Sequence, residues 1–208
     1  MTGTTGKEHM GNMLLHSPSN LANVSGQLDT GRFLTPYSDV VALMVLEHQA
    51  HMVNLILHVT DIADSGPGRL GHAVEELLEY MLFTREDRLR EPVQGTSGFS
   101  AEFAQHGPRD KKGRSLRDFD LNTRLFRYPC SYMIFSDAFD TMPAAARRRV
   151  YRSLWEVLTG RDKSPKFAAI PSAQRREVLE ILRDTKHGLP EYWFERTRKA
   201  SGDQLSQR

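Results

Sequence analysis

The sequence predicts an all-α fold: an irregular helical domain with a loop-rich N-terminal arm and a long central loop. Three observations predict it. Apolar residues recur at helical spacing in several stretches, no stretch alternates strongly as a strand does, and glycine and proline gather between the helical stretches. With 208 residues, 39% of them apolar and 26% charged, the chain has the composition of a folded globular protein.

The chain is expected to divide into three parts. Residues 1–36 form an extended arm without sustained periodicity, residues 37–195 form a single helical domain, and residues 196–208 form a flexible tail. Within the domain, a loop over about 92–118 contains four glycines and two prolines. Long loops of this kind are often functional or disordered.

The most apolar helix is expected to come first. Ser38 and Asp39 suit its N-cap, and the sequence DSGPG stops it after about Ala63. Its apolar residues cover nearly every side, which is typical of a central helix. The other expected helices cover 70–83, 119–126, 130–139, 143–160 and 172–188.

Charge and hydropathy exclude some classes of partner. The net charge is +2, and the basic stretches 109–117 and 147–149 lack interleaved aromatic residues, so they predict a solvated loop and a helix face and no nucleic acid partner. The longest uninterrupted apolar run, 40–46, is far shorter than the ~20 residues that cross a bilayer, so no membrane span is expected. The start of the chain carries no secretion signal, which predicts a cytoplasmic protein if the chain is complete.

Cys130 is the only cysteine, which excludes an intrachain disulfide, a multi-cysteine zinc site and a CxxCH motif. It suits either a thiolate stabilised near a helix N-terminus or a buried, unreactive thiol. The sequence has no GxSxG motif, phosphate loop or dinucleotide fingerprint, and no nucleophile, base and orienting group can be assembled from it. An enzyme is therefore not expected.

A polar stripe interrupts the first helix. Glu47, His51, Asn54 and His58 follow one another at steps of four, three and four residues, which places them on one face, with His48 beside them. Buried polar groups require partners. The stripe therefore faces water, other polar side chains, a metal or a cofactor.

Two interpretations of this stripe remain open. His48 with His51, or Glu47 with His51, can reach one point and ligate zinc or iron, and His72 of the next helix can complete the site. Alternatively, the histidines are hydrogen-bonded at a helix interface or exposed, and His72 lies on a solvated polar face with Glu75, Glu76 and Glu79.

Four stretches of the chain carry a family resemblance: TGTTGKEHMGN, LTPYSDVVALMVLEHQ, YRSLWEVLTGRDKSPKF and residues 93–139. Together they resemble the C-terminal part of uncharacterised bacterial cytochrome c-like proteins. The likeness spans nearly the whole chain. In that family a haem-attachment CxxCH lies upstream of the part that resembles residues 1–12, and the proteins are exported. The resemblance therefore implies a periplasmic protein and a haem-bearing upstream segment or partner protein.

The resemblance also implies residue roles. His9 and Met10 match the family's histidine–methionine pair, and the helix motif is matched by Glu47, His48, Gln49 and Asn54. Val53 and His58 depart from it, because the family has a histidine and an arginine there. The candidate haem-binding residues are His9, Met10, His48 and His51.

Three functions follow as hypotheses. The resemblance implies a haem-associated protein with an electron-transfer role, since imidazole and thioether are haem ligands. The alternatives are a helical scaffold or partner-binding domain without chemistry of its own, and a metal-binding domain that uses Glu47, His48 and His51. The sequence indicates no oligomeric state.

Overall fold

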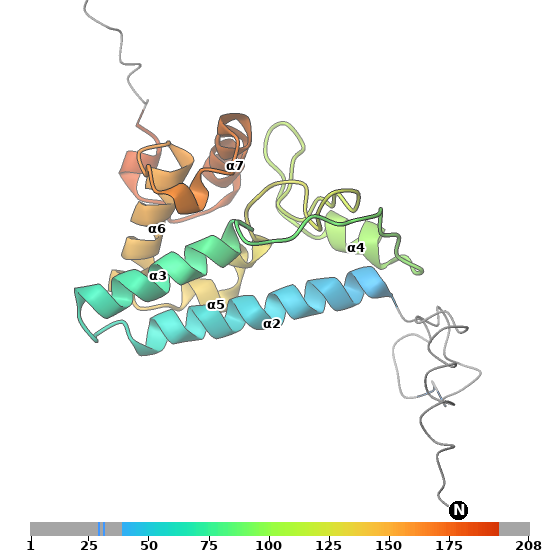
Figure 1. Cartoon of the computed structure of the whole chain (residues 1–208), viewed down its shortest axis with the longest axis horizontal. Helices are drawn as coiled ribbons and strands as arrows, with labels where there is room; N and C mark the ends of the chain where they lie inside the picture. The colour runs from blue at the N-terminus through green and yellow to red at the C-terminus, as the bar shows by residue number, and fades with distance from the viewer. Residues whose placement is uncertain (1–28, 30, 32–38, 196–208) are drawn as a thin grey trace, which may run out of the picture.

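A computed structural model describes residues 29, 31 and 39–195, and within them it confirms the all-α class (Figure 1). The expected arm and tail lie outside these residues, apart from positions 29 and 31. The α-helices are α2 (Val40–Asp61), α3 (Pro67–Met81), α4 (Phe99–Gln105), α5 (Asp137–Asp140), α6 (Ala144–Leu158) and α7 (Ser172–Thr185). Short 3-10 helices are η2 (Tyr132–Phe135), η3 (Pro165–Phe167) and η4 (Glu191–Trp193).

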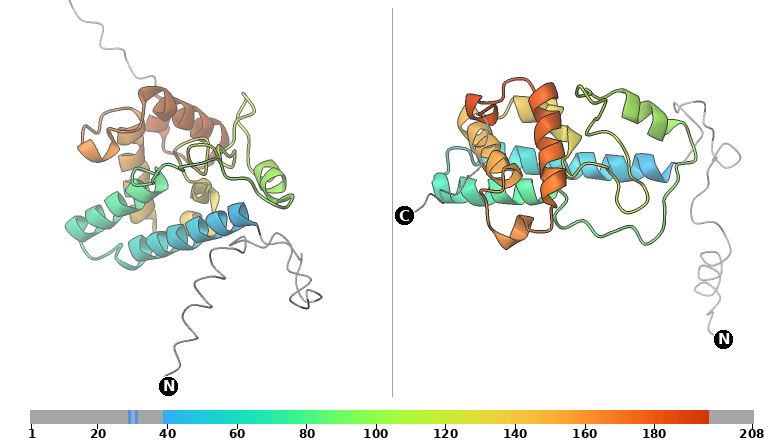
Figure 2. Two further views of the ribbon diagram at one scale, coloured as in Figure 1. Left: turned by 45° about the vertical axis from the view of Figure 1, so that its right-hand side comes forward. Right: turned by 90° about the horizontal axis from the view of Figure 1, so that it is seen from above.

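The helices pack in a stepwise order. α2 and α3 form a hairpin, α6 packs on α3, and α7 packs on α6 (Figures 1 and 2). The shorter helices α4 and α5 also contact α2. The buried apolar side chains of these elements form one cluster.

Asp39 fixes the start of α2, as the sequence predicts. Its Oδ1 accepts hydrogen bonds from the backbone N–H groups of Val41 and Ala42, at 2.9 and 3.2 Å. Its Oδ2 accepts from the N–H and the hydroxyl of Ser97, at 3.0 and 2.6 Å. Burial opposes ionisation, but these hydrogen bonds lower the pKa of Asp39 below its ordinary value. One carboxylate therefore caps α2 and ties the segment before α4 to it.

We expect Asp39→Ala to lower the free energy of unfolding by about 2–3 kcal/mol, because the variant loses both the cap and the buried link to Ser97. Asp39→Asn keeps one acceptor oxygen and is expected to lose about half as much. Urea denaturation of the two variants and the unchanged protein measures the difference. A loss below about 0.5 kcal/mol for the alanine variant is typical of an ordinary surface residue and would contradict this role of Asp39.

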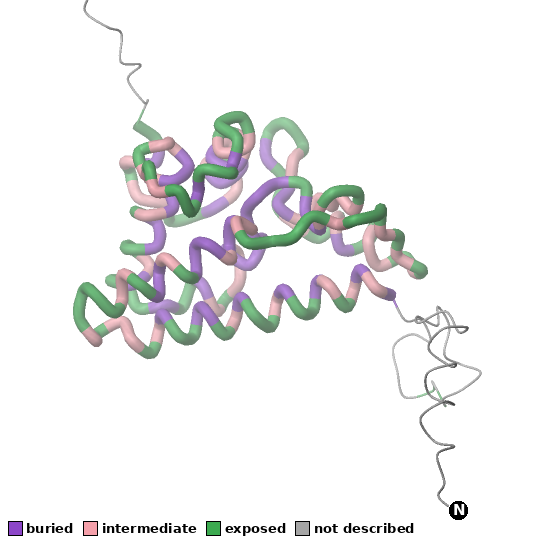
Figure 3. The backbone as a smooth tube through the Cα atoms, viewed as in Figure 1, coloured by how far each residue is buried: buried purple, intermediate pink, exposed green. Residues whose placement is uncertain are grey.

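α2 is buried on one face only, contrary to the prediction of a helix covered on every side. Its buried residues are Val41, Val45, His48, Met52, Leu55, Ile56 and Val59. On the opposite face Leu43, Leu46 and Leu57 are 56%, 60% and 49% exposed. Buried and exposed positions alternate along α2, as expected of a helix that is covered on one face (Figure 3). By length and composition alone α2 is apolar enough to cross a membrane, a test that the core helices of soluble proteins also pass.

The predicted helix over 119–126 is wrong. Phe119 and Phe126 pair instead as an antiparallel bridge around a tight turn. Within the turn the Asp120 carboxylate accepts from the N–H groups of Asn122 and Thr123, at 3.1 and 3.3 Å. Aspartate favours such turns because its side chain replaces backbone partners. The apolar residues of 119–126 have a spacing that is compatible with a helix, but the chain forms a turn there.

The expected helix over 130–139 is divided. Ser131 caps η2 and Ser136 caps α5, and Cys130 precedes both. The predicted helices over 70–83, 143–160 and 172–188 are present as α3, α6 and α7, with shifted ends.

The expected loop over 92–118 is more ordered than its composition indicates. It contains α4, and its basic part lies against α7. Arg114 donates to Asp110 and Glu180, each at 2.7 Å, and Lys112 donates to the same Glu180 carboxylate at 2.8 Å. Arg114 is largely buried, and the Arg117 guanidinium lies over the rings of Phe103 and Tyr132. Arg114 and Arg117 are therefore held against the fold, whereas Arg109, Lys111 and Lys112 are exposed, as the predicted solvated loop expects.

Candidate functional site

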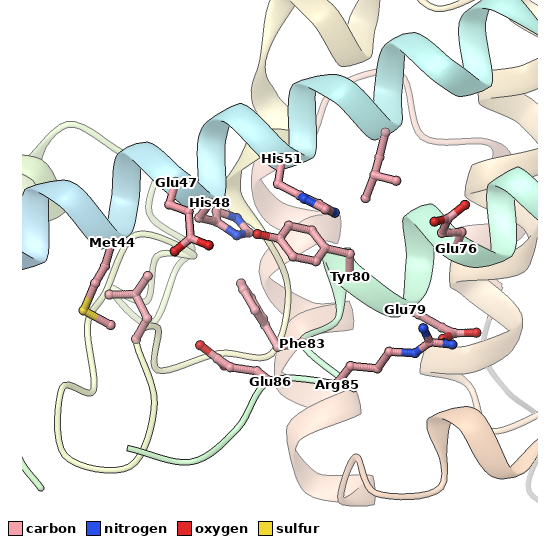
Figure 4. A pocket seen from close by; sticks show the side chains of 12 residues that line it. Met44, Glu47, His48, His51, Glu76, Glu79, Tyr80, Phe83, Arg85 and Glu86 are labelled. Atoms are coloured by element: carbon pink, nitrogen blue, oxygen red, sulfur yellow. The ribbon is translucent and has the colours of Figure 1, made fainter. Parts of the chain in front are cut away.

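A cleft of about 480 Å³ lies between α2 and α3 (Figure 4). Its volume is within the range of small-molecule sites. α2 contributes Met44, Glu47, His48, His51 and Leu55; α3 contributes Glu76, Glu79 and Tyr80; Phe83, Arg85, Glu86 and Leu125 complete the lining. The cleft is thus formed by the side chains of the α2–α3 hairpin and of the segment that follows it.

His48 forms the buried back of the cleft. Its side chain is almost entirely inaccessible, and its ring lies 5.4 Å from that of Tyr80 and 5.1 Å from that of Phe83. Burial, with a smaller effect from His51, lowers the pKa of His48 to about 4. The ring is therefore neutral at neutral pH.

Nε2 of His48 lies 2.7 Å from the hydroxyl of Ser131. Such a distance would suit a nucleophile and its base. However, Ser131 is fully buried and does not line the cleft, and its Oγ also accepts from the N–H of Met133 at 3.1 Å. The backbone N–H of Ser131 donates to the carbonyl of Met81 at 2.8 Å. The pair therefore joins α2, the end of α3 and η2.

Tyr80 forms the aromatic wall. The His51 ring lies 4.2 Å from the Tyr80 ring, and His51 itself is exposed. The pKa of Tyr80 is raised by burial and then by the negative charges of Glu47 and Glu86. Tyr80 therefore lies within electrostatic range of both carboxylates.

The cleft is rich in carboxylates. Burial raises the pKa of Glu86, although a backbone hydrogen bond from Leu125 opposes the shift. Glu79 is buried and forms ion pairs with Arg85 at 2.6 Å and with Lys166 at 2.9 Å. Among the described lining residues, Arg85 is the only arginine or lysine, and Glu79 already pairs with it.

The structure brings together Glu47, His48 and His51, three of the four candidate metal ligands, at one cleft. His72 is exposed on α3 and does not line it. Within the described ranges no group of three or more His, Cys, Asp or Glu side chains is arranged to hold a metal ion. His9 and Met10 lie outside the described residues.

The polar stripe of α2 faces outward. Its members are all exposed: Glu47, His51, Asn54 and His58. His48, beside the stripe, is instead buried and hydrogen-bonded, as the interpretation of interface histidines expects. Glu79 differs from the expected solvated polar face, because it is buried and paired with two cations.

Cys130 is fully buried, and burial raises the pKa of its thiol to about 12. It is therefore protonated at neutral pH. This agrees with a buried, unreactive thiol and not with a stabilised thiolate.

Sequence reasoning missed Tyr80, Phe83 and Glu86 as cleft residues. Tyr80 and Phe83 fall in the last turn of the helix predicted over 70–83, and Glu86 falls after it. α3 ends at Met81 with Leu82 as its C-cap, and the next residue, Phe83, has a positive φ of 55° that turns the chain so that Glu86 returns to the cleft. Only a concentration of aromatic and acidic residues after position 79 could have indicated this.

Comparisons with protein-family models, with curated proteins and with solved structures find no match to this chain. The cytochrome c-like resemblance and the roles that it implies therefore stay predictions.

Proposed function

We propose that this chain is a small-molecule-binding module whose α2–α3 cleft holds an organic cation with an apolar body. The observation that carries the proposal is the position of the Glu47 and Glu86 carboxylates beside the rings of Tyr80 and Phe83 (Figure 4). A cation against aromatic faces gains from their negative potential, and an apolar body gains from burial. Carboxylates at the same place neutralise the charge that would otherwise be costly to desolvate.

The electrostatics of the cleft favour a cation over an anion. Four glutamates line it, and Arg85 is occupied by one of them. Glu86 is exposed overall, and neighbouring atoms desolvate its carboxylate enough to raise its pKa, although Leu125 and Arg124 oppose the shift. A bound cation would offset the cost of this desolvation, whereas an uncharged ligand of the same shape would not. The site is therefore expected to bind the cation more tightly than the uncharged ligand.

Benzyltrimethylammonium is a suitable probe, with benzyl alcohol as the control that has the ring without the charge. We expect titration calorimetry to give a Kd on the order of 100 µM for the cation, and at least about tenfold weaker binding of the alcohol. Equal affinities for the cation and the alcohol would show that the carboxylates do not contribute to binding. Absence of binding by both probes would contradict the proposal.

Glu86→Gln is expected to weaken binding of the same cation by about tenfold, because a full charge near the ligand is replaced by a neutral amide of similar size. The matched control is Glu91→Gln, since Glu91 is exposed as Glu86 is but does not line the cleft. A similar loss in both variants would indicate a general effect of net charge instead of a local site.

Binding should also depend on pH. Because burial raises the pKa of Glu86, its carboxylate takes up a proton at a higher pH than an ordinary glutamate. Affinity for the cation is therefore expected to fall as the pH is lowered through this raised pKa, and Glu86→Gln should remove that part of the dependence. An affinity that is constant down to the ordinary range of glutamate would contradict this role of Glu86.

Haem association is a second candidate, favoured by the presence of His48, His51 and Met44 in one cleft. Imidazole and thioether are ligands of haem iron. Of these side chains, His51 is the exposed imidazole, whereas His48 Nε2 is already bonded to Ser131. The surrounding glutamates oppose the negative propionates of haem, so the described residues fit this group less well than a cation.

Addition of haemin tests this candidate. Haem ligation would shift the Soret band, and a haemin titration followed by this shift gives the affinity. His51→Ala would weaken that affinity by about tenfold. A spectrum that is unchanged by the protein would exclude the candidate.

A further inference from the structure

A second surface of α2 is separate from the cleft. Its outer face carries apolar residues at alternating steps of three and four: Leu43, Leu46, Ala50, Val53 and Leu57; Val53, at the edge of this stripe, is half-buried and also packs against the core. The three leucines are about half exposed or more, and at 3.6 residues per turn they lie on the side of α2 roughly opposite its buried residues. Large apolar side chains at this spacing are typical of the seam between two paired helices.

We propose that this apolar stripe of α2, defined by the five residues above, pairs with the same stripe of a second copy of the chain in an antiparallel arrangement. The register that aligns the stripes sets Leu46 against Leu57 of the second copy and Ala50 against Val53. The two-fold axis repeats both contacts, and Leu43 lies opposite Thr60 of the second copy at each end of the interface.

The polar residues beside the stripe favour the antiparallel direction. In this register Glu47 faces Asn54 of the second copy, and His58 of the second copy lies one turn further along the same side, so the carboxylate gains an amide donor and an imidazole. A parallel pair would set Glu47 beside Ala42, which offers no partner.

The size of the stripe predicts a moderate affinity. From Leu43 to Leu57 it extends about 21 Å at 1.5 Å per residue, so a single helix pair buries less than the ~1,000 Å² expected of a permanent interface. We therefore expect a monomer–dimer equilibrium with a Kd on the order of 10–100 µM. Glu47 also lines the proposed cation site, so the association is tested at Leu46, which does not line that cleft.

Sedimentation velocity of the full chain tests the association. The sedimentation coefficient should rise from that of a monomer at about 1 µM to that of a dimer at several hundred µM. Leu46→Glu should weaken dimerisation by at least about tenfold without changing the helical circular dichroism, since Leu46 is exposed. Phe194→Glu is the matched control, because Phe194 is 55% exposed outside the stripe. A monomer at every concentration would overturn the proposal. The stripe would then be covered by another occupant, the N-terminal arm or a membrane surface.

Disulfide trapping tests the direction of the helices. In the variant Leu46→Cys/Leu57→Cys the two thiols of one chain are about 16 Å apart along α2, too far for an intrachain bond, so any crosslink joins two chains. The antiparallel register predicts rapid crosslinking of this double variant and slow crosslinking of either single variant alone. The native Cys130 is buried and serves as an internal control. Efficient crosslinking of the single variants would indicate a parallel pair and would overturn the register.

Discussion

Lowering the pH from about 7 to about 4 is expected to reduce the free energy of unfolding by about 3 kcal/mol through His48 alone. Burial holds the pKa of His48 near 4 in the folded chain, against an ordinary value of 6.5. Between these values the unfolded chain binds a proton that the folded chain excludes. The stability is therefore fully present above pH 6.5 and is lost as the pH falls towards the folded pKa.

The variant His48→Gln separates this effect from other acid-sensitive groups. Glutamine keeps a polar partner for Ser131 but does not titrate. The carboxylates of Asp39 and Asp110, whose pKa values are lowered, lose their contributions mainly below pH 4. Urea denaturation at several pH values should show a steep loss in the unchanged protein and a much flatter profile in the variant between about pH 6.5 and 4.5. Equal slopes would show that His48 is not buried in the neutral form.

Phe126→Ala is expected to lower the free energy of unfolding by about 3–5 kcal/mol. Phe126 is 1% exposed although it lies in no helix. Its ring stacks on Phe119 at 5.4 Å and meets the edges of His48 and Tyr132 at 5.6 and 5.4 Å. Removal of the ring would leave a cavity between the tight turn and the α2–α3 hairpin.

Phe194→Ala is the control for this prediction, because the same side chain is removed from an exposed position. It is expected to change stability by less than about 0.5 kcal/mol. Chemical denaturation measures both variants. A small loss for Phe126→Ala would mean that the turn is not part of the cooperative core.

The long helices could be predicted because their local signals agree. In α2 the cap residue Asp39 precedes the first apolar turn, and in α6 Pro143 precedes a stripe that includes Val150 and Leu154. Both patterns act within a few residues. The exposed face of α2 could not be predicted, because apolar residues on every side do not reveal which neighbours cover them.

The segment between α3 and α5 was predicted less well for a physical reason. Its order depends on partners that are distant in the sequence. Asp39 lies 58 residues from Ser97, and Arg114 lies 66 residues from Glu180. Composition alone predicts a loop for this segment, whereas these distant contacts stabilise an ordered structure.

The candidate site was predicted in part. Spacing on one helix brought Glu47, His48 and His51 together, but it did not distinguish the buried His48 from the exposed His51. The aromatic wall comes from another helix. Tyr80 joins His51 only because α3 folds back along α2.

The most direct test of the central claim is a map of backbone amide chemical shifts during titration with benzyltrimethylammonium. The proposed cation site predicts that the largest changes fall on His51, Tyr80, Phe83 and Glu86, and that they are absent with benzyl alcohol at the same concentration. Changes that centre on another part of the chain, or no saturable change at all, would contradict the assignment of the α2–α3 cleft as a binding site for organic cations.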